Sequence, residues 1–353
     1  MINKNAPVLV TGANGYVASW LVKKLLEEGI TVHAAIRNPE QKEKIAHLLK
    51  IAEKAKGNLK FFEGDLLKEG SYKKAMEGCE LVYHTASPFT IAVENARKDL
   101  LEPAEKGTEN VLNTANEVTS VKRVVVTSSC AAIYTDAVDC AAAPNGILDE
   151  SIWNTTASED YQPYSYSKTI AEKKAWEIAK SQSRWDLVTI NPSFVMGPPL
   201  NTKSNTSESF NILKQIGDGV FKAGAPKMGI GVVDVRDVAE AHFQAGFKEN
   251  ASGRYITSAH NTNMFEMAQQ LFPKFGSNYP IPKNTIPKWL IVLLGPIIDK
   301  KMDRTMLRNN VNHEWKADNS KIKNELGMTF RPLKETMEDA FQHLINEGVI
   351  SSK

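Results

Sequence analysis

The stretch Val10-Thr11-Gly12-Ala13-Asn14-Gly15-Tyr16-Val17-Ala18 decides the fold of this chain. It closes a short apolar run that begins at residue 7, as in a buried parallel strand. It then leads into a helical pattern in which Val17, Leu21 and Leu25 recur at every fourth position. A strand, a glycine turn and a helix in this order are the setting in which a glycine motif binds the pyrophosphate of a dinucleotide.

Three small residues in this stretch have separate tasks in such a turn. Gly12 allows the tight turn, Gly15 lets the backbone approach phosphate oxygens, and Ala18 lets the helix pack closely on the strand. The free N–H groups at the helix N-terminus then favour an anion. Because the spacing is G-x-x-G-x-x-A, the motif alone leaves open that these are only turn and packing residues.

The end of the second predicted strand indicates which dinucleotide is bound. Residues 31–36 form that strand, and Arg37 follows it where a carboxylate would accept the ribose hydroxyls of NAD. An arginine at this place accommodates the 2′-phosphate of NADP instead. Lys44, early in the next predicted helix, would add a second cation. We therefore expect NADP(H), the alternative being that both side chains are solvated surface charges.

Short apolar segments alternate with helical patterns as far as residue 192. This order predicts an α/β fold, a doubly wound and mostly parallel Rossmann-like sheet with helices on both faces. A ligand should then lie at the carboxyl ends of the strands. The predicted strands are residues 7–11, 31–36, 59–62, 80–84, 122–127 and 185–190.

The alternation is lost after about residue 193. We expect a dinucleotide-binding domain over residues 1–192 and a smaller irregular α/β lobe that binds substrate over residues 193–353. Some of the second part, about residues 230–250, would return to the Rossmann core. The elements predicted in this part are a strand at 232–234, a helix at 235–247 and a last helix at 332–347.

Composition limits the partners and the location of the chain. Its 353 residues carry 43 Lys and Arg against 41 Asp and Glu, a net charge of +2. That balance gives no electrostatic reason to expect nucleic acid or an anionic membrane as partner. The three cysteines have no metal-binding spacing and are odd in number, so we expect no metal and no disulfide framework. Without a signal-peptide pattern, a reducing, cytoplasmic setting is expected.

The most apolar stretch, residues 289–298, is interrupted by Gly295-Pro296 and is too short to span a bilayer. We expect it to pack on the core as a helix or turn, a dimer contact or a pocket wall being the alternative. The chain itself is expected to be a monomer or a homodimer.

Tyr164 and Lys168 stand four residues apart at the start of a predicted helix, so they lie on one helix face. A phenol is a weak acid with a reference pKa of about 10. A neighbouring ammonium is expected to lower that pKa, so that the phenol can exchange a proton with a carbonyl or alcohol oxygen. Tyr166 has no lysine four residues on, which favours Tyr164. A chance pair on a helix surface is the alternative, and its place after the alternating strands argues against it.

The predicted strand at 122–127 ends in hydroxyl groups at Ser128 and Ser129. A hydroxyl there can donate a hydrogen bond to a substrate oxygen and stabilise charge that builds on it. Because the two residues are adjacent, they point in different directions. The pattern leaves open which one serves, and capping of the strand end is the alternative for either.

With these motifs in order, the chain resembles the extended short-chain dehydrogenase/reductases nearly end to end. Within them it is most similar to the branch of dihydroflavonol 4-reductases, cinnamoyl-CoA reductases and yeast-type ketone and methylglyoxal reductases. The motifs that carry the resemblance are T-G-A-N-G-Y-V-A at 11–18, G-D-L at 64–66, H-T-A-S-P at 84–88, R-V-V-V-T-S-S at 123–129, Y-x-x-x-K at 164–168, N-P-S at 191–193 and D-V-R-D-V-A-E-A-H at 234–242.

The resemblance implies roles for individual residues. It implies Ser129, Tyr164 and Lys168 as the catalytic residues, and packing roles for His84 and His242. The substrate pocket would include Phe89, Ser129 and Phe194. The implied cofactor-binding residues are Gly12, Asn14, Gly15, Tyr16, Val17, Arg37, Lys44, Asp65, Leu66, Thr85, Ala86, Ser87, Thr127, Tyr164, Lys168, Pro192 and Ser193.

These residues predict an NADPH-dependent reductase that converts an aldehyde or ketone to the alcohol by hydride transfer. One alternative is a nucleotide-sugar epimerase or dehydratase, or a hydroxysteroid-type alcohol dehydrogenase. A non-catalytic NADP(H)-sensing protein is disfavoured by the intact Tyr–Lys pair. Cys130 and the segment 135–160 depart from the plant enzymes, so a phenolic substrate does not follow from the resemblance.

Overall fold

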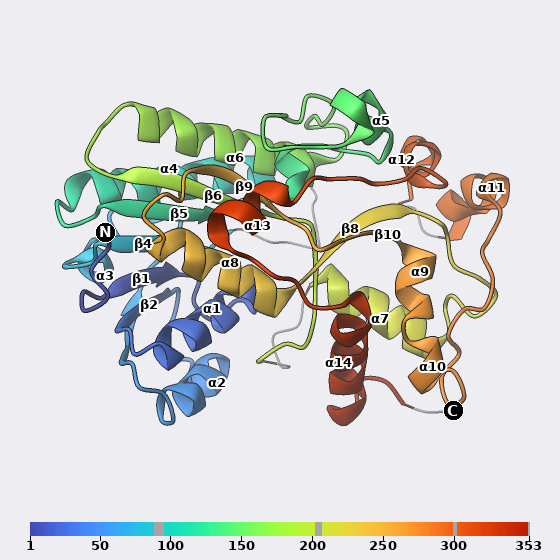
Figure 1. Ribbon diagram of the computed structural model, residues 1–353, viewed down its shortest axis with the longest axis horizontal. Coiled ribbons are helices and arrows are strands. Elements are labelled where there is room, and N and C mark those ends of the chain that lie inside the picture. Colours follow the sequence, from blue (N-terminus) through green and yellow to red (C-terminus); the bar gives the residue numbers. More distant parts are fainter. Residues whose placement is uncertain (88–94, 202–206, 299–301, 352–353) are drawn as a thin grey trace.

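A seven-stranded parallel sheet forms the centre of the molecule (Figure 1). The structure is a computed structural model, and it describes residues 1–87, 95–201, 207–298 and 302–351. The strand order is β3-β2-β1-β4-β5-β6-β9. The strands are β1 Val8–Thr11, β2 Val32–Ile36, β3 Leu59–Glu63, β4 Leu81–His84, β5 Arg123–Thr127, β6 Asp186–Pro192 and β9 Gly253–Thr257.

The strand order reverses between β1 and β4, which pair in parallel although two strands separate them in the sequence. At such a switch point the connections leave in opposite directions and open a crevice at the carboxyl ends of the strands. The predicted fold class, a doubly wound parallel sheet with a smaller second lobe, is confirmed. The first six strands coincide with the predicted segments to within two residues.

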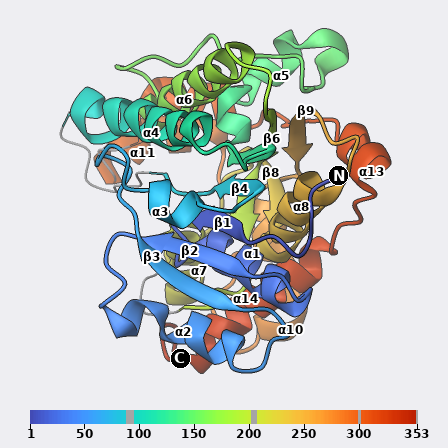
Figure 2. The ribbon, with the colours of Figure 1, turned by 90° about the vertical axis from the view of Figure 1, so that its left-hand side faces the viewer.

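Helices cover both faces of the sheet because successive strand side chains point to opposite sides (Figure 2). Val8 and Val10 face one core cluster, whereas Leu9 faces the other. The first face is covered by α1 Tyr16–Glu27, α2 Lys42–Ala52, α8 Val235–Phe247 and α13 Ser320–Leu326. The second is covered by α3 Lys73–Met76, α4 Glu102–Glu117 and α6 Pro163–Lys180.

A three-stranded sheet of order β10-β8-β7 organises the smaller lobe. Its strands are β7 Phe194–Met196, β8 Gly229–Asp234 and β10 His260–Asn263. It shares a core cluster with α7 Glu208–Asp218, α9 Met264–Gln269, α10 Phe272–Phe275 and α14 Leu333–Asn346. The other helices are α5 Val138–Ala142, α11 Lys288–Ile298 and α12 Arg304–Asn310. A π-helical segment at Arg97–Leu101 leads into α4, and short 3₁₀ segments lie at Cys130–Ala132 and Pro144–Gly146.

Two features differ from the sequence expectations. Strand β9 was not predicted, since its five residues begin with a glycine and an arginine, yet it forms the edge of the main sheet beside β6. Residues 289–298 form a helix, as expected. One face of this helix is exposed and does not pack on the core, so the expectation of core packing is wrong for that face. Trp289, Leu293 and Ile297 are 68%, 51% and 73% exposed.

None of the helices within the described ranges combines the length and the hydropathy that crossing a bilayer requires.

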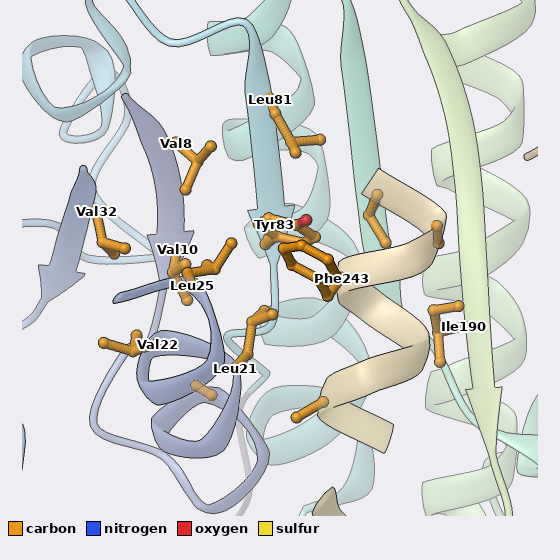
Figure 3. Close-up of a cluster of buried hydrophobic side chains, with 14 of the residues drawn as sticks. Val8, Val10, Leu21, Val22, Leu25, Val32, Leu81, Tyr83, Ile190 and Phe243 are labelled. Carbon is orange, nitrogen blue, oxygen red and sulfur yellow. The ribbon is translucent and has the colours of Figure 1, made fainter. Parts of the chain in front are cut away.

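The contact between α1 and the sheet is the part of the core that holds the glycine turn in place (Figure 3). Leu21, Leu25 and Leu26 are fully buried against β1 and β4. Phe243 of α8 closes the same cluster, so α8, from the second half of the chain, belongs to the packing of this face.

We expect Leu25→Ala to lower the free energy of unfolding by about 2–5 kcal/mol, because it removes buried methyl groups and leaves a cavity. Leu49→Ala on α2, where the side chain is 40% exposed, is the matched control and should change stability by less than about 1 kcal/mol. Thermal and urea unfolding measure both. Equal losses in the two variants would contradict the assignment of this cluster as the core.

Candidate active site

The turn between β1 and α1 has the geometry of an anion site. Gly12 has φ +61°, and a Cβ there would lie 3.0 Å from the Cα of Ala86, so a side chain is excluded on two grounds. Gly15 is the N-cap of α1, its N–H donates to the Gly12 carbonyl at 2.9 Å, and no side chain caps the helix. The first N–H groups of α1 therefore have no partner within the helix and are available to a phosphate.

The Tyr16 side chain serves the lobe rather than the turn. Its hydroxyl donates to the Gly197 carbonyl at 2.7 Å, and one helical turn later Trp20 Nε1 donates to the Pro198 carbonyl at 2.9 Å. These bonds tie the chain that follows β7 to α1. Because the Tyr16 hydroxyl is used in this way, we expect Tyr16 to contact the cofactor through its backbone N–H and not through its side chain.

Arg37 and Lys44 lie where the sequence predicts them, at the end of β2 and in the first turn of α2. Both are exposed. No carboxylate in the described ranges lies within ion-pair distance of either side chain. Both cations are therefore free to meet a phosphate.

The loop after β3 carries Asp65 and Leu66, and a single amide side chain holds it. Asn110 of α4 donates from Nδ2 to the carbonyls of Asp65, Leu66 and Lys68 at 3.3, 3.0 and 2.9 Å. Its Oδ1 accepts the Gly70 N–H at 3.1 Å. Sequence reasoning missed Asn110, because a lone asparagine inside a helix gives no signal of what lies opposite.

The residues after β4 join the two strands at the switch point. The Thr85 hydroxyl donates to the Thr11 carbonyl, and the Ala86 N–H donates to Thr11 Oγ1 at 3.1 Å. The Ser87 hydroxyl accepts a hydrogen bond from Lys168 Nζ at 2.8 Å. The predicted cofactor residues 85–87 thus link the glycine turn to the Tyr–Lys helix.

Adjacent Ser128 and Ser129 have different surroundings. Ser128 is buried, and its hydroxyl donates to the Glu172 carboxylate inside the sheet–helix layer. The Ser129 Oγ accepts the Ala131 N–H at 3.1 Å, and the Ser129 side chain lies close enough to the Tyr164 hydroxyl to act on its pKa. The two motifs that the sequence could not connect, the serine pair and the Tyr–Lys pair, therefore meet at Ser129.

Glu172 is the centre of a buried network behind the serines. Arg254 Nε donates to its carboxylate at 2.6 Å and Asn191 Nδ2 at 2.7 Å. Asn191 Nδ2 also donates to the Ser129 carbonyl at 3.2 Å, and the Arg254 guanidinium lies 4.0 Å from the Trp153 ring centroid. Sequence reasoning missed Glu172, although its place four and eight residues after the Lys–Tyr pair puts it on the same helix face.

Tyr164 is 39% exposed, so a substrate can reach it. Although Tyr164 is partly exposed, desolvation raises its pKa, and the nearby Ser129 side chain acts in the opposite direction. This differs from the expected lowering by Lys168, whose Nζ bonds Ser87 and lies 5.7 Å from the Tyr164 ring centroid. Burial lowers the pKa of Lys168 to about 8. A phenol that keeps its proton at neutral pH is suited to be a proton donor.

The two histidines of the motifs are neutral packing groups. Burial lowers the pKa of His84 to about 3 and that of His242 to about 4. His242 Nδ1 lies 2.8 Å from the Val238 carbonyl, which makes Nδ1 the donor, so Nε2 accepts from the Thr127 hydroxyl at 2.6 Å. Since His242 takes the hydroxyl proton, Thr127 can meet the cofactor only through its backbone or as an acceptor through the hydroxyl oxygen.

The end of β6 offers a polar atom without a partner. Pro192 is buried, and the oxygen of the Ser193 hydroxyl is buried with no hydrogen-bond partner in the described part of the chain. Phe194, in β7, packs partly against the core of the lobe. Phe89, the other predicted pocket residue, lies outside the described residues. A pocket between these strand ends is lined by Leu66, Ala86, Ser87, Thr127, Lys168 and Glu172, among others.

A second buried carboxylate, that of Asp136, lies near the start of the Tyr–Lys helix. Sequence reasoning did not identify it. Asp136 accepts hydrogen bonds from the Tyr161 hydroxyl at 2.6 Å, Asn309 Nδ2 at 2.9 Å and Asn310 Nδ2 at 2.5 Å. It joins the chain that follows Ser129 to α12 and to the residue three before Tyr164. Cys130, whose thiol donates to the Asn191 carbonyl at 3.1 Å, is buried, and burial raises its pKa.

These features fit an extended dinucleotide. The uncapped α1 N-terminus suits a pyrophosphate, the two free cations beside β2 suit a further phosphate, and Lys168 with Ser87 suits a ribose. The unpartnered Ser193 hydroxyl is a polar group for the far end of such a ligand. Within the described ranges, no group of three or more His, Cys, Asp or Glu side chains could hold a metal ion.

Comparison with known proteins agrees with this geometry. The chain is 36% identical over 350 residues to tetraketide alpha-pyrone reductase 1 of Arabidopsis thaliana, covering 98% of this chain and 97% of that protein. It is 40% identical over 272 residues to cinnamoyl-CoA reductase CAD2 of Medicago truncatula, covering 75% and 81%. The structure of yeast methylglyoxal/isovaleraldehyde reductase Gre2 complexed with NADPH superposes with a TM-score of 0.78 at 29% identity, covering 98% and 100%.

The model of one protein family matches residues 8–256, more than half of the chain and all seven strands of the main sheet except the last residue of β9. The resemblance noted in the sequence is thereby confirmed. The chain belongs to the NAD dependent epimerase/dehydratase family, the extended short-chain dehydrogenase/reductases.

Proposed function

We propose that the chain reduces an aldehyde or ketone to the alcohol with NADPH. The chain is an NADP(H)-dependent oxidoreductase, and this conclusion holds whichever residues form the site. The relatives are named as reductases, and the Gre2 structure holds NADPH. We further propose a cytoplasmic enzyme whose partner is a small carbonyl or alcohol.

One observation carries the proposal: the Ser129 side chain lies close enough to the Tyr164 hydroxyl to favour its phenolate, and Lys168 follows one helical turn further on. Two neighbouring hydroxyls of this kind form a place where one carbonyl oxygen can accept two hydrogen bonds. Charge develops on that oxygen during reduction, so donors already in position lower the barrier.

NADPH supplies the hydride when bound. The uncapped α1 N-terminus would hold its pyrophosphate, and Arg37 with Lys44 its 2′-phosphate. Lys168 and Ser87 would hold the ribose beside the nicotinamide. The Ser129 Oγ accepts the Ala131 N–H through a lone pair, and its hydroxyl proton would donate to the substrate oxygen. Tyr164 then transfers its hydroxyl proton to the oxygen that becomes the alcohol.

Lys168 supports the proton transfer in two ways. As an ammonium it favours the phenolate that remains on Tyr164 after the proton leaves. As a donor to a ribose hydroxyl it fixes the cofactor at the distance the reaction needs. The contact of Lys168 Nζ with Ser87 places the ammonium next to the cofactor crevice.

The sugar-nucleotide and sensor alternatives find less support in the contacts. Ser129 is followed by a buried cysteine, and the buried carboxylate of the network behind the serines, that of Glu172, is already paired with Arg254. Among the residues that the structure describes, the buried carboxylate behind Ser129 is thus not free for a dehydration step. A protein that only binds NADP(H) does not require the neighbouring hydroxyls of Ser129 and Tyr164, because no substrate oxygen has to be protonated.

We expect the enzyme to prefer NADPH to NADH and Arg37→Ala to remove that preference. A charge-assisted bond to phosphate is worth about 1.5–3 kcal/mol, so KM for NADPH should rise tenfold or more while KM for NADH changes little. Lys50→Ala, an exposed cation at the other end of α2, is the control. Equal kcat/KM for the two cofactors in the wild type would contradict the NADP assignment of Arg37.

We expect Ser129→Ala to lower kcat by about 10²–10³, the loss typical of one oxyanion donor. Ser128→Ala should instead lower stability, because it removes a donor to buried Glu172, while the folded fraction keeps most of its turnover. Turnover and melting temperature measured on both variants separate the roles. If Ser128→Ala were well folded but inactive and Ser129→Ala nearly normal, the assignment of Ser129 as the catalytic serine would be wrong.

Tyr164→Phe should keep the fold and NADPH binding while kcat falls about 10²–10⁴-fold, because the lost hydroxyl matters only as the carbonyl oxygen gains charge. KM should move less than kcat. Lys168→Ala should lower kcat at least as far and also weaken NADPH binding. Steady-state kinetics with a panel of aldehydes and ketones, alongside cofactor titration by fluorescence, measure these effects.

Tyr166→Phe is the matched control for the phenol and should remain active. Retained kcat in Tyr164→Phe with an inactive Tyr166→Phe would move the site by two residues. If both Tyr164→Phe and Lys168→Ala stayed active, the proton-transfer mechanism would have to be abandoned.

A further inference from the structure

Helix α11 is unusual in this molecule because it presents its apolar side chains outward. It consists of Lys288 and ten residues without charge, and of its side chains that the structure describes, four large apolar ones are exposed. Their exposed fractions are 68% for Trp289, 51% for Leu293, 38% for Leu294 and 73% for Ile297. Trp289, Leu293 and Ile297 follow at every fourth position and therefore form one stripe. A contiguous apolar surface of this kind marks an interaction site.

The opposite face of α11 is fixed to the lobe. Gly295 is buried, and a Cβ there would lie 2.8 Å from Leu307 Cδ1 of α12, so the two helices pack closely at this point (Figure 1). Lys288 Nζ donates to the Arg308 carbonyl at 2.7 Å and contacts His313 Nε2 at 3.0 Å. These bonds anchor the start of α11 to the end of α12, so the outward stripe is held in place.

Exposed basic residues on the segments next to α11 form what we call the basic border. Arg304 and Arg308 of α12, beside α11, are exposed, as is Lys283 ahead of it. Over residues 283–308 the sequence has six basic residues (Lys283, Lys288, Lys300, Lys301, Arg304 and Arg308) against two acidic ones (Asp299 and Asp303), a net charge of +4. The chain as a whole is only +2. The chain is nearly neutral as a whole, but residues 283–308 are strongly cationic. For this segment an anionic membrane is a suitable electrostatic partner, in contrast to the expectation from the overall charge.

We propose that α11 docks on the surface of an anionic lipid bilayer, with the stripe of Trp289, Leu293 and Ile297 inserted at the headgroup level and the basic border over the phosphates. A helix with Trp and Leu on one side and Lys and Arg beside it is typical of segments that lie in a membrane interface. The charge decides between this occupant and a second copy of the chain. A two-fold contact through α11 would bring two cationic borders together, which like-charge repulsion opposes.

The test is binding of the full chain to vesicles of phosphatidylcholine alone and of phosphatidylcholine mixed with phosphatidylserine. We expect partition to the mixed vesicles to be at least about tenfold stronger and to weaken in high salt. The Trp289 emission should shift to the blue on binding, and Trp289→Phe should lose that shift. Equal binding to both vesicle types, or none, would overturn the proposal.

Two double variants separate the apolar and the electrostatic parts. Leu293→Glu with Ile297→Glu should lower partition at least tenfold, whereas Leu49→Glu, an exposed leucine on α2, should leave it unchanged. Arg304→Ala with Arg308→Ala should lower partition to anionic vesicles about thirtyfold, whereas Lys42→Ala with Lys50→Ala on α2 should not. All variants change exposed side chains, and unchanged NADPH binding confirms that they are folded.

The same variants test the other occupant. Sedimentation of the wild type without lipid should show no association through α11. A dimer that dissociates in Leu293→Glu with Ile297→Glu would assign the stripe to a second copy and overturn the lipid proposal. Because every readout is binding rather than turnover, failure of this proposal leaves the proposed reductase activity untouched.

Discussion

The site depends on one buried ion pair, that of Glu172 with Arg254, inside the layer between β5, β6 and α6. An isolated buried carboxylate is strongly unfavourable, and removing one partner of a buried ion pair typically costs about 3–5 kcal/mol. Here Arg254 supplies the opposite charge, and donors from Asn191 and Ser128 satisfy the remaining lone pairs. The network joins three elements that are distant in the sequence, so the position of the serine strand end is set relative to the helix that carries Tyr164.

This network explains why two adjacent serines can have different tasks. Ser128 is used to satisfy Glu172, which leaves Ser129 on the opposite side of the strand end and in contact with Tyr164. Arg254 extends the same support outward, since Nη1 donates to the Glu150 carbonyl at 3.0 Å and the guanidinium stacks on Trp153. Arg254, which pairs with Glu172 behind the serines, therefore also holds the segment around Glu150 and Trp153 that follows Ser129 in the chain.

The sequence was sufficient where the pattern is local. The first six strands, the glycine turn, Arg37 at its strand end and the spacing of Tyr164 and Lys168 are read from neighbouring residues, and the structure has each where it was expected. The residues that were missed act across long separations. Asn110 clamps a loop that lies 40 or more residues earlier, and Arg254 reaches back 82 residues to Glu172. The protonation of Tyr164 was also misjudged, because burial depends on the surrounding fold whereas the spacing to Lys168 does not.

The start of α6 shows how the lobe and the catalytic helix are coupled. Gln162, a non-glycine residue with φ +55°, stands immediately before α6, and such a backbone conformation is unfavourable unless neighbouring contacts impose it. The Tyr161 hydroxyl bound to Asp136 is such a contact, and Asn309 and Asn310 of α12 hold the same carboxylate from the other side. Because α12 also packs against α11, one chain of contacts runs from the outward apolar stripe to the residue three positions before Tyr164.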